Sequence, residues 1–241
     1  MGRMLPAIPA TINKIPRTNQ KVSIASNIIS WMISFKDSFN ILSMNILHDY
    51  ISAWPAAFPS QELPWMLPMK ISSLITIAIQ SLDEDYFINE DVAIHRTSLV
   101  EDHAVLKGPI IISSGCFVGA HAYMRGGVYL GENVSIGPGC EIKSSFIMSN
   151  SALAHFNFVG DSIIGSEVNM EAGSIIANHH NDRENKIIDV LIEGKKTSTG
   201  VEKFGALVGD HSKIGANAVL SPGTILSPKS IVKRLSLIEQ C

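Results

Sequence analysis

Three cationic residues recur at a fixed spacing and could together bind an anion. Lys107, Arg125 and Lys143 are 18 residues apart, and each directly follows an apolar residue. If residues at this spacing stack on successive turns of the fold, their backbones lie about 4.8 Å apart. Like charges that close repel by about 1 kcal/mol even in water, so a phosphate or carboxylate bound across them would stabilise the column. The alternative is three solvated side chains that splay apart.

His155 has the side chain best suited to proton transfer. It lies twelve residues after Lys143, just after a position of the apolar series described below. An imidazole there could act as a general base toward an amine or hydroxyl, although a lone histidine is also typical of a surface. His103 and His121 are 18 residues apart but have no carboxylate or cysteine at a matching height. We therefore expect exposed corner histidines rather than a metal pair, and predict no metal site.

An apolar residue at every sixth position provides the framework for these residues. In a chain with 46% hydrophobic residues, twelve consecutive sixth positions are apolar: Ile88, Ile94, Val100, Leu106, Ile112, Val118, Met124, Leu130, Ile136, Ile142, Met148 and Ala154. By chance such a run has a probability on the order of 10⁻⁴. The spacing shortens to five residues once, from Val159 to Ile164. Apolar residues then recur at every sixth position again, and this pattern continues to Val232. A second, smaller series contains Cys116 and Cys140, which we expect to be core thiols without a function.

A period of six with inward aliphatic residues is typical of a parallel β-helix, in which each hexad is one strand and one corner. Coils must stack, because a single coil cannot bury its apolar face. The pattern resembles the left-handed β-helix of the hexapeptide-repeat acyltransferases, whose three-sided coils take 18 residues. We therefore predict a mainly β protein, with a left-handed parallel β-helix of about six to seven coils over residues 87–235.

Residues 177–205 interrupt the repeat. Gly194 lies between two stretches that alternate polar and apolar residues, which predicts a hairpin-like flap. Loops that leave a regular scaffold commonly carry the functional site, and an insertion that is merely tolerated is the alternative.

The region before the repeat is predicted to be helical. Residues 44–86 form a helical N-terminal region, in which Met69 to Leu82 lacks glycine and proline and suits a helix. Residues 1–43 form an N-terminal extension, either disordered or helical, with helical spacing from Ile28 to Lys36. A helix on a membrane surface is the rival interpretation, but the polar face carries few Lys or Arg residues.

Composition excludes several classes of partner. A net charge of −3 gives no global reason to bind nucleic acid. The longest uncharged apolar stretch, residues 22–35, is 14 residues and too short to span a bilayer, so we expect no stable membrane insertion. Three cysteines without a CxxC motif favour a reducing compartment, and we predict a cytoplasmic protein.

Two segments carry a specific resemblance. Residues 154–178, AHFNFVGDSIIGSEVNMEAGSIIAN, resemble the catalytic coil of the glucosamine-1-phosphate acetyltransferase domain, the C-terminal half of the bifunctional UDP-N-acetylglucosamine pyrophosphorylase/acetyltransferase. Residues 203–224, KFGALVGDHSKIGANAVLSPGT, resemble the tail of archaeal sugar-1-phosphate nucleotidylyltransferases. The resemblance extends from about Pro64 to Lys233, and the intervals between Arg125, Lys143 and His155 match those of the family's functional residues.

The resemblance implies an acetyl-CoA-dependent N-acetyltransferase that acts on an amino-sugar phosphate such as glucosamine-1-phosphate, in UDP-N-acetylglucosamine synthesis. It makes His155 the catalytic base. It assigns the acceptor to Arg125, Lys143, Phe158, Asn169, Asn178 and Lys186. It assigns acetyl-CoA to Ala172, Gly209, Lys229 and Lys233, with Arg234 as a further candidate for the CoA phosphates. Members of the family are trimers with sites between subunits, which implies a homotrimer.

The sequence departs from the family at two positions. Phe158 stands where the family has a tyrosine, and Glu184 stands where it has a lysine, with Lys186 nearby as a substitute. These departures support an acyltransferase with another acceptor or acyl donor, and a non-catalytic β-helix for oligomerisation or sugar-nucleotide binding is a third interpretation. No glycine-rich GxGTRM segment precedes the coils, so uridylyl transfer would require a separate nucleotidyltransferase as partner.

Overall fold

The computed structural model describes residues 46–241. It begins with helix α2 (Ile46–Tyr50), the 3-10 turn η1 (Pro64–Met66) and helix α3 (Leu67–Ile79). Helix α3 starts two residues before and ends three residues before the predicted span, with a proline in its first turn, where a missing N–H costs no hydrogen bond. The predicted extension, residues 1–43, lies outside the described residues. No helix within residues 46–241 is long and apolar enough to cross a bilayer.

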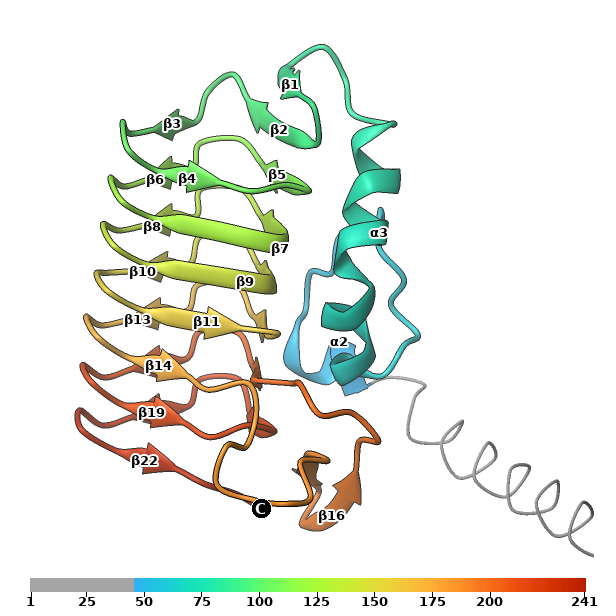
Figure 1. Ribbon diagram of the computed structural model, residues 1–241, viewed down its shortest axis with the longest axis vertical. Coiled ribbons are helices and arrows are strands. Elements are labelled where there is room, and N and C mark those ends of the chain that lie inside the picture. The colour runs from blue at the N-terminus through green and yellow to red at the C-terminus, as the bar shows by residue number, and fades with distance from the viewer. Residues whose placement is uncertain (1–45) are drawn as a thin grey trace, which may run out of the picture. The chain divides into compact units, whose positions relative to one another are not determined.

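The rest of the described chain is a β-helix whose coils stack in one column (Figure 1). Each coil has three faces. Face 1 is a seven-stranded parallel sheet of β3 (Leu99–Val100), β6 (Phe117–Val118), β8 (Ser135–Ile136), β10 (Ala152–Leu153), β13 (Asn169–Met170), β18 (Lys213–Ile214) and β21 (Ile231–Val232). The mainly β fold class and the left-handed β-helix are confirmed.

The other two faces are joined through two bent strands, β7 (Tyr123–Leu130) and β9 (Glu141–Ile147). Face 2 comprises β4 (Val105–Leu106), the first halves of β7 and β9, β11 (Phe158–Gly160), β14 (Ile175–Ile176), β19 (Val219–Leu220) and β22 (Leu237–Ile238). Face 3 comprises β2 (Val92–His95), β5 (Ile110–Ile112), the second halves of β7 and β9, β12 (Ile163–Ile164), β17 (Ala206–Val208) and β20 (Thr224–Leu226). The turns between faces are called corners 1–2, 2–3 and 3–1.

Inward aliphatic residues in register form the core. On face 1, Val118, Ile136, Leu153, Met170 and Ile214 are in successive coils and are all buried. Stacking therefore removes from water the apolar residues that a single coil would leave exposed, which is the hydrophobic driving force for this fold.

The predicted core thiols are confirmed. Cys116 and Cys140 are 2% and 0% exposed, and the Cys116 thiol donates to the carbonyl of Gly131 at 3.0 Å. Burial raises the pKa of Cys116 to about 11 and raises the pKa of Cys140 as well.

We expect both buried thiols to resist alkylation in the native state, because the reactive thiolate is suppressed and access is blocked. Iodoacetamide at pH 8, followed by mass spectrometry, should label Cys116 and Cys140 only after denaturant is added. Labelling of either residue at the same rate in native and unfolded protein would contradict the core assignment.

The repeat begins later than predicted, and the number of turns is slightly higher. The solenoid has about eight turns rather than six to seven. Ile88 is not an inward residue: it lies on β1 (Tyr86–Asn89), which pairs antiparallel with β2, and it is 43% exposed. At the C-terminal end, β22 extends the stack three residues beyond the predicted limit at 235.

The predicted phase is wrong at Met148 and Ala154. Leu130 pairs with Ile147, and Ile136 pairs with Leu153, so the chain makes a second five-residue step after Ile142. The cause is at corner 2–3. The coil above turns there through Gly126 and Gly127, both with positive φ, whereas β9 turns through Ser144 alone, at φ +47°. Because this corner is one residue shorter, the inward positions that follow it occur one residue earlier in the sequence than predicted. His155 therefore follows its inward residue, Leu153, by two positions rather than one.

The predicted flap is a hairpin. The chain leaves the coils after β14 and returns at β17, and between them β15 (Asp189–Ile192) pairs antiparallel with β16 (Lys195–Ser198). Glu193 and Gly194 form the two-residue turn with φ values of +51° and +75°, as a type I′ turn requires. The hairpin lies against the coils, since a Cβ on Gly223 would be 2.3 Å from the Asp189 carbonyl oxygen.

The segment before the coils covers face 3. Phe58 packs between Tyr129 and Phe146, with ring centroids 5.0 and 5.2 Å away. Helix α3 approaches corner 2–3 so closely that a Cβ on Gly127 would be 2.7 Å from Ile71 Cγ2. This helix therefore forms one wall beside the predicted cation column, and Figure 1 shows it running along the coils.

Candidate active site

The cation column is present at corner 2–3, but each member already has a partner within the chain, and Lys107 and Arg125 share the Tyr123 ring. Arg125 and Lys143 are in register on β7 and β9. Arg125 donates to Glu141 Oε1 from Nη2 at 2.7 Å and from Nε at 3.0 Å. The ammonium of Lys107 lies 5.1 Å from the centre of the Tyr123 ring, a cation–π contact. Groups of the chain itself therefore reduce the repulsion between these cations. The sequence analysis predicted either an anion bound across the column or solvated side chains that splay apart, and neither prediction included such internal partners.

Lys143 forms the most buried charge pair of this corner. Its Nζ is 2.6 Å from Asp161 Oδ2, and the side chains of Lys143 and Asp161 are 17% and 8% exposed. The Asn178 amide donates to the same carboxylate oxygen. The structure therefore brings together two predicted acceptor residues, Lys143 and Asn178, through Asp161, which the sequence analysis missed.

Lys143 also lines a cavity of about 630 Å³ at corner 2–3. Helix α3 lines it with Pro68, Met69 and Ser72, and the segment 200–203 at the end of the inserted loop lines it as well. Lys203 is thus the loop lysine that shares a cavity with Lys143, while Glu184 and Lys186 are exposed on another part of the insertion. Sequence analysis overlooked Lys203, although it is the first residue of the quoted KFGALVGD stretch.

His155 lies at corner 1–2 and is exposed. Within residues 46–241 no group hydrogen-bonds to its ring, so both ring nitrogens are open to a ligand. Strand β11 runs along face 2 from this corner to corner 2–3, where Gly160 is in register with Lys143. Phe158 lies on this strand between the two corners, opposite Glu141. Lys143 and His155 therefore lie at opposite ends of face 2, separated by at least the length of a three-residue strand, which is about 7–10 Å.

Ala172 and Asn169 lie one coil below His155. The Gly173 N–H donates to the His155 carbonyl oxygen at 2.8 Å, which stacks the two corners directly. The Ala172 carbonyl accepts from Asn217 at 3.1 Å, and among the described residues no acceptor takes the Ala172 N–H. That N–H is available to a ligand beside His155.

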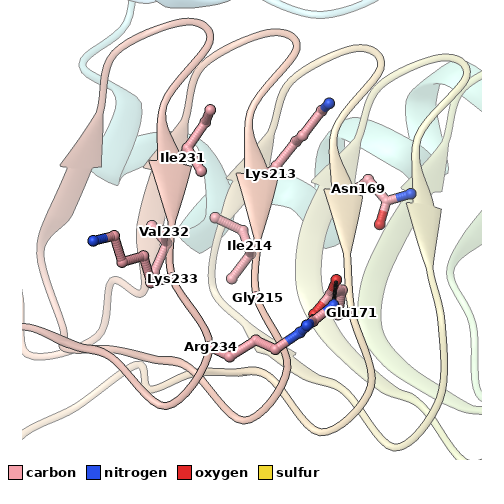
Figure 2. Close-up of a pocket in the computed structure, with 9 residues that line it drawn as sticks. All are labelled: Asn169, Glu171, Lys213, Ile214, Gly215, Ile231, Val232, Lys233 and Arg234. Atoms are coloured by element: carbon pink, nitrogen blue, oxygen red, sulfur yellow. Dashed lines mark hydrogen bonds and ion pairs between the residues drawn. The ribbon is translucent and has the colours of Figure 1, made fainter.

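A second cavity, of about 650 Å³, extends from Asn169 toward the last coils at corner 1–2 (Figure 2). We call it the corner groove; it is lined by Asn169, Glu171, Lys213, Ile214, Gly215, Ile231, Val232, Lys233 and Arg234. It contains Lys233 of the predicted donor residues. Glu171 and Lys213 were not predicted to line a site. They lie before and after the 177–205 insertion, and the sequence did not show that their coils are neighbours in the stack.

Two predicted donor residues lie elsewhere. Gly209 and Lys229 are at corner 3–1, and neither lines the corner groove. A Cβ on Gly209 would be 2.5 Å from the backbone nitrogen of Pro228, so close packing of coils explains this glycine. His103 and His121 stack at corner 1–2 with ring centroids 5.5 Å apart. The part of the chain that the structure describes has no cluster of three or more residues able to hold a metal ion.

Comparison with known proteins adds an independent finding. The chain is 36% identical over 142 residues to a bifunctional sugar-1-phosphate nucleotidylyltransferase/acetyltransferase of Sulfurisphaera tokodaii, covering 52% of this chain and 35% of that protein. It is 37% identical over 159 residues to the bifunctional protein GlmU of Methanococcus vannielii, covering 58% and 38%. The chain therefore spans about a third of the length of these curated relatives.

Among solved structures, the acetyltransferase domain of PglB from Neisseria gonorrhoeae is 12% identical, with a TM-score of 0.26, over 61% of this chain and 48% of that one. The family described as "GMPPB C-terminal domain" matches residues 106–239, which are all but the first coils of the β-helix. Since this match covers more than half of the chain, the protein belongs to the family of GMPPB C-terminal domains.

Proposed function

We propose that the protein is an acetyl-CoA-dependent N-acetyltransferase that acts on an amino-sugar phosphate such as glucosamine-1-phosphate. Relatives whose names include sugar-1-phosphate nucleotidylyltransferase/acetyltransferase support transfer of an acyl group to a sugar phosphate. The single observation that carries the proposal is the arrangement on face 2. A lysine that is 17% exposed shares a cavity with a second lysine at one end, and an exposed histidine with no hydrogen-bond partner among the described residues lies at the other.

In the proposed reaction, Lys143 and Lys203 hold the phosphate of the acceptor and thereby orient its amine toward corner 1–2. His155 accepts a proton as the amine nitrogen bonds to the thioester carbonyl carbon. The C–S bond then breaks, and coenzyme A leaves as the thiol when its sulfur takes the proton from His155. The Ala172 N–H, which has no acceptor among the described residues, would stabilise the negative charge on the carbonyl oxygen.

We further propose a homotrimer, because within one protomer the two ends of the site lie at least about 7–10 Å apart along face 2. A neighbouring subunit against this face would enclose the acceptor. Sedimentation equilibrium would test the stoichiometry, and a stable monomer with full activity would contradict this part of the proposal.

The direct test is thiol release from acetyl-CoA with glucosamine-1-phosphate as acceptor. We expect release that requires both compounds, with formation of the N-acetyl product detected by mass spectrometry. Binding of CoA without release would redirect the proposal to another acceptor. Absence of both binding and release would exclude the enzyme.

Replacement of the cavity lysine gives a sharper prediction. Lys203→Ala should raise the KM for the acceptor about tenfold or more, since a charge-assisted hydrogen bond to a phosphate is lost. Lys186→Ala tests the original assignment and should change the KM less than twofold, as should the exposed hairpin variant Lys195→Ala. A larger effect of Lys186→Ala than of Lys203→Ala would restore the sequence-based assignment.

A second candidate function is a non-catalytic module for oligomerisation or sugar-nucleotide binding. The observation that favours it is the internal neutralisation of Arg125 by Glu141 and of Lys143 by Asp161, at 2.7 and 2.6 Å. A protein that binds a nucleotide sugar but no CoA would establish this alternative.

A further inference from the structure

Glu171 interrupts a column of small residues at corner 1–2. The residues directly after the inward residue of face 1 in successive coils are Glu101, Gly119, Gly137, Ala154, Glu171, Gly215 and Lys233. At the three glycines of this column the next coil leaves no space; for example, a Cβ on Gly215 would be 2.4 Å from the backbone nitrogen of Arg234. Glu171 therefore places a carboxylate where the three coils directly above it have glycine or alanine, and Glu101 is its counterpart in the first coil, where it accepts from the Ala120 N–H at 2.7 Å.

This carboxylate forms a bridge to Arg234, which lies two coils further down (Figure 2). Glu171 Oε2 accepts from Arg234 Nε at 2.6 Å, and Oε1 accepts from Nη2 at 2.7 Å. The Ala216 N–H of the intervening coil also donates to Oε2, at 2.8 Å. The Glu171–Arg234 bridge thus crosses the corner groove above Gly215, directly beside Ala172.

The Glu171–Arg234 ion pair persists at low pH, but another anion can compete with Glu171 for Arg234. The guanidinium of Arg234 and the Ala216 N–H lower the pKa of Glu171 to about 2, so the carboxylate stays ionised at physiological pH. However, the Arg234 and Glu171 side chains are 72% and 39% exposed, and exposed ion pairs are held only weakly because water screens them. An anion that offers Arg234 more charge than one carboxylate can therefore displace Glu171.

The corner groove carries an excess of positive charge to attract such an anion. Lys213, Lys233 and Arg234 line it, against Glu171 as its one acidic residue. In Figure 2 the side chain of Lys233 extends away from Glu171, while that of Arg234 lies across the groove toward it. Arg234 therefore cannot bind a ligand while it is paired with Glu171.

We propose that the Glu171–Arg234 bridge makes the corner groove selective for acyl donors that carry a polyphosphate. The anion replaces Glu171 at Arg234 and clears the groove beside Ala172, whereas an uncharged pantetheine thioester leaves the bridge closed. This inference rests on the proposed function in one respect, because it assigns the corner groove to the acyl donor.

The test compares Glu171→Gln with Glu167→Gln in the full chain. Glutamine keeps the shape of the side chain but removes its negative charge. Glu167 is a matched control, since it pairs with His211 at 3.0 Å at corner 3–1, away from the groove. Calorimetric titration with CoA, inorganic pyrophosphate and pantetheine should show CoA and pyrophosphate bound about threefold to tenfold more tightly by Glu171→Gln. Glu167→Gln should bind like the wild type, and Arg234→Gln should lose pyrophosphate binding.

The outcomes separate this inference from the proposed function. Equal or weaker binding of pyrophosphate by Glu171→Gln would overturn the role of the bridge, even in a protein that transfers acetyl groups. Tighter binding by Glu171→Gln in a protein without acetyl transfer would support the bridge as a control on anion binding and reject only the enzyme. Equal affinity of the wild type for pantetheine and CoA would contradict the selectivity.

Discussion

His155→Ala should reduce thiol release from acetyl-CoA by roughly 10²–10⁴-fold, the usual contribution of a positioned general base. The expectation follows from the exposed position of the imidazole at corner 1–2, one coil above Ala172, whose N–H has no acceptor among the described residues. Because the side chain makes no hydrogen bond to the described residues, its removal should not disturb the fold. The measurement is the steady-state rate with saturating glucosamine-1-phosphate.

His121→Ala is the matched control for this experiment. His121 is exposed at the same corner two coils above, where it stacks on His103. We expect this variant to keep the wild-type rate. If both histidine variants retain full rates in a protein that transfers acetyl groups, another base is required, and the assignment of His155 is wrong.

Gly137→Ala should destabilise the β-helix by about 3 kcal/mol or more. A Cβ at this position would lie 1.4 Å from the carbonyl oxygen of Ala154 in the next coil. The obstacle is backbone rather than a movable side chain, so the two coils must separate at corner 1–2. At about 2–4 °C per kcal/mol for a chain of this size, the melting temperature should fall by about 6–12 °C.

Gly194→Ala provides the comparison, because it makes the same chemical change without the steric conflict. Gly194 has nothing within 4 Å of an added Cβ, but its φ of +75° is unfavourable for alanine. The expected cost is about 1 kcal/mol. Thermal unfolding followed by circular dichroism would compare the two variants. Similar melting temperatures would show that the coils near Gly137 are less closely packed than described.

The sequence by itself determined the repeat and thereby the fold. Side chains at every sixth position must point inward if each hexad is one strand and one corner, so the inward positions of Val118 and Ile136 follow from periodicity alone. The hairpin at Gly194 was also predictable, because few residues tolerate positive φ in a two-residue turn. The placement of Arg125 and Lys143 in one column follows from the same arithmetic.

The tertiary structure decided how the remaining residues meet. The second five-residue step could not be read from the sequence, since Met148 is as apolar as Ile147 and either satisfies the pattern. The pairing of Lys143 with Asp161, the entry of Lys203 into the same cavity and the bridge from Glu171 to Arg234 join residues that are 18 to 63 positions apart. Periodicity specifies which side of a coil a residue occupies. Which charges come into contact depends on the length of each corner and on how the insertion returns to the stack, and packing of the coils sets both.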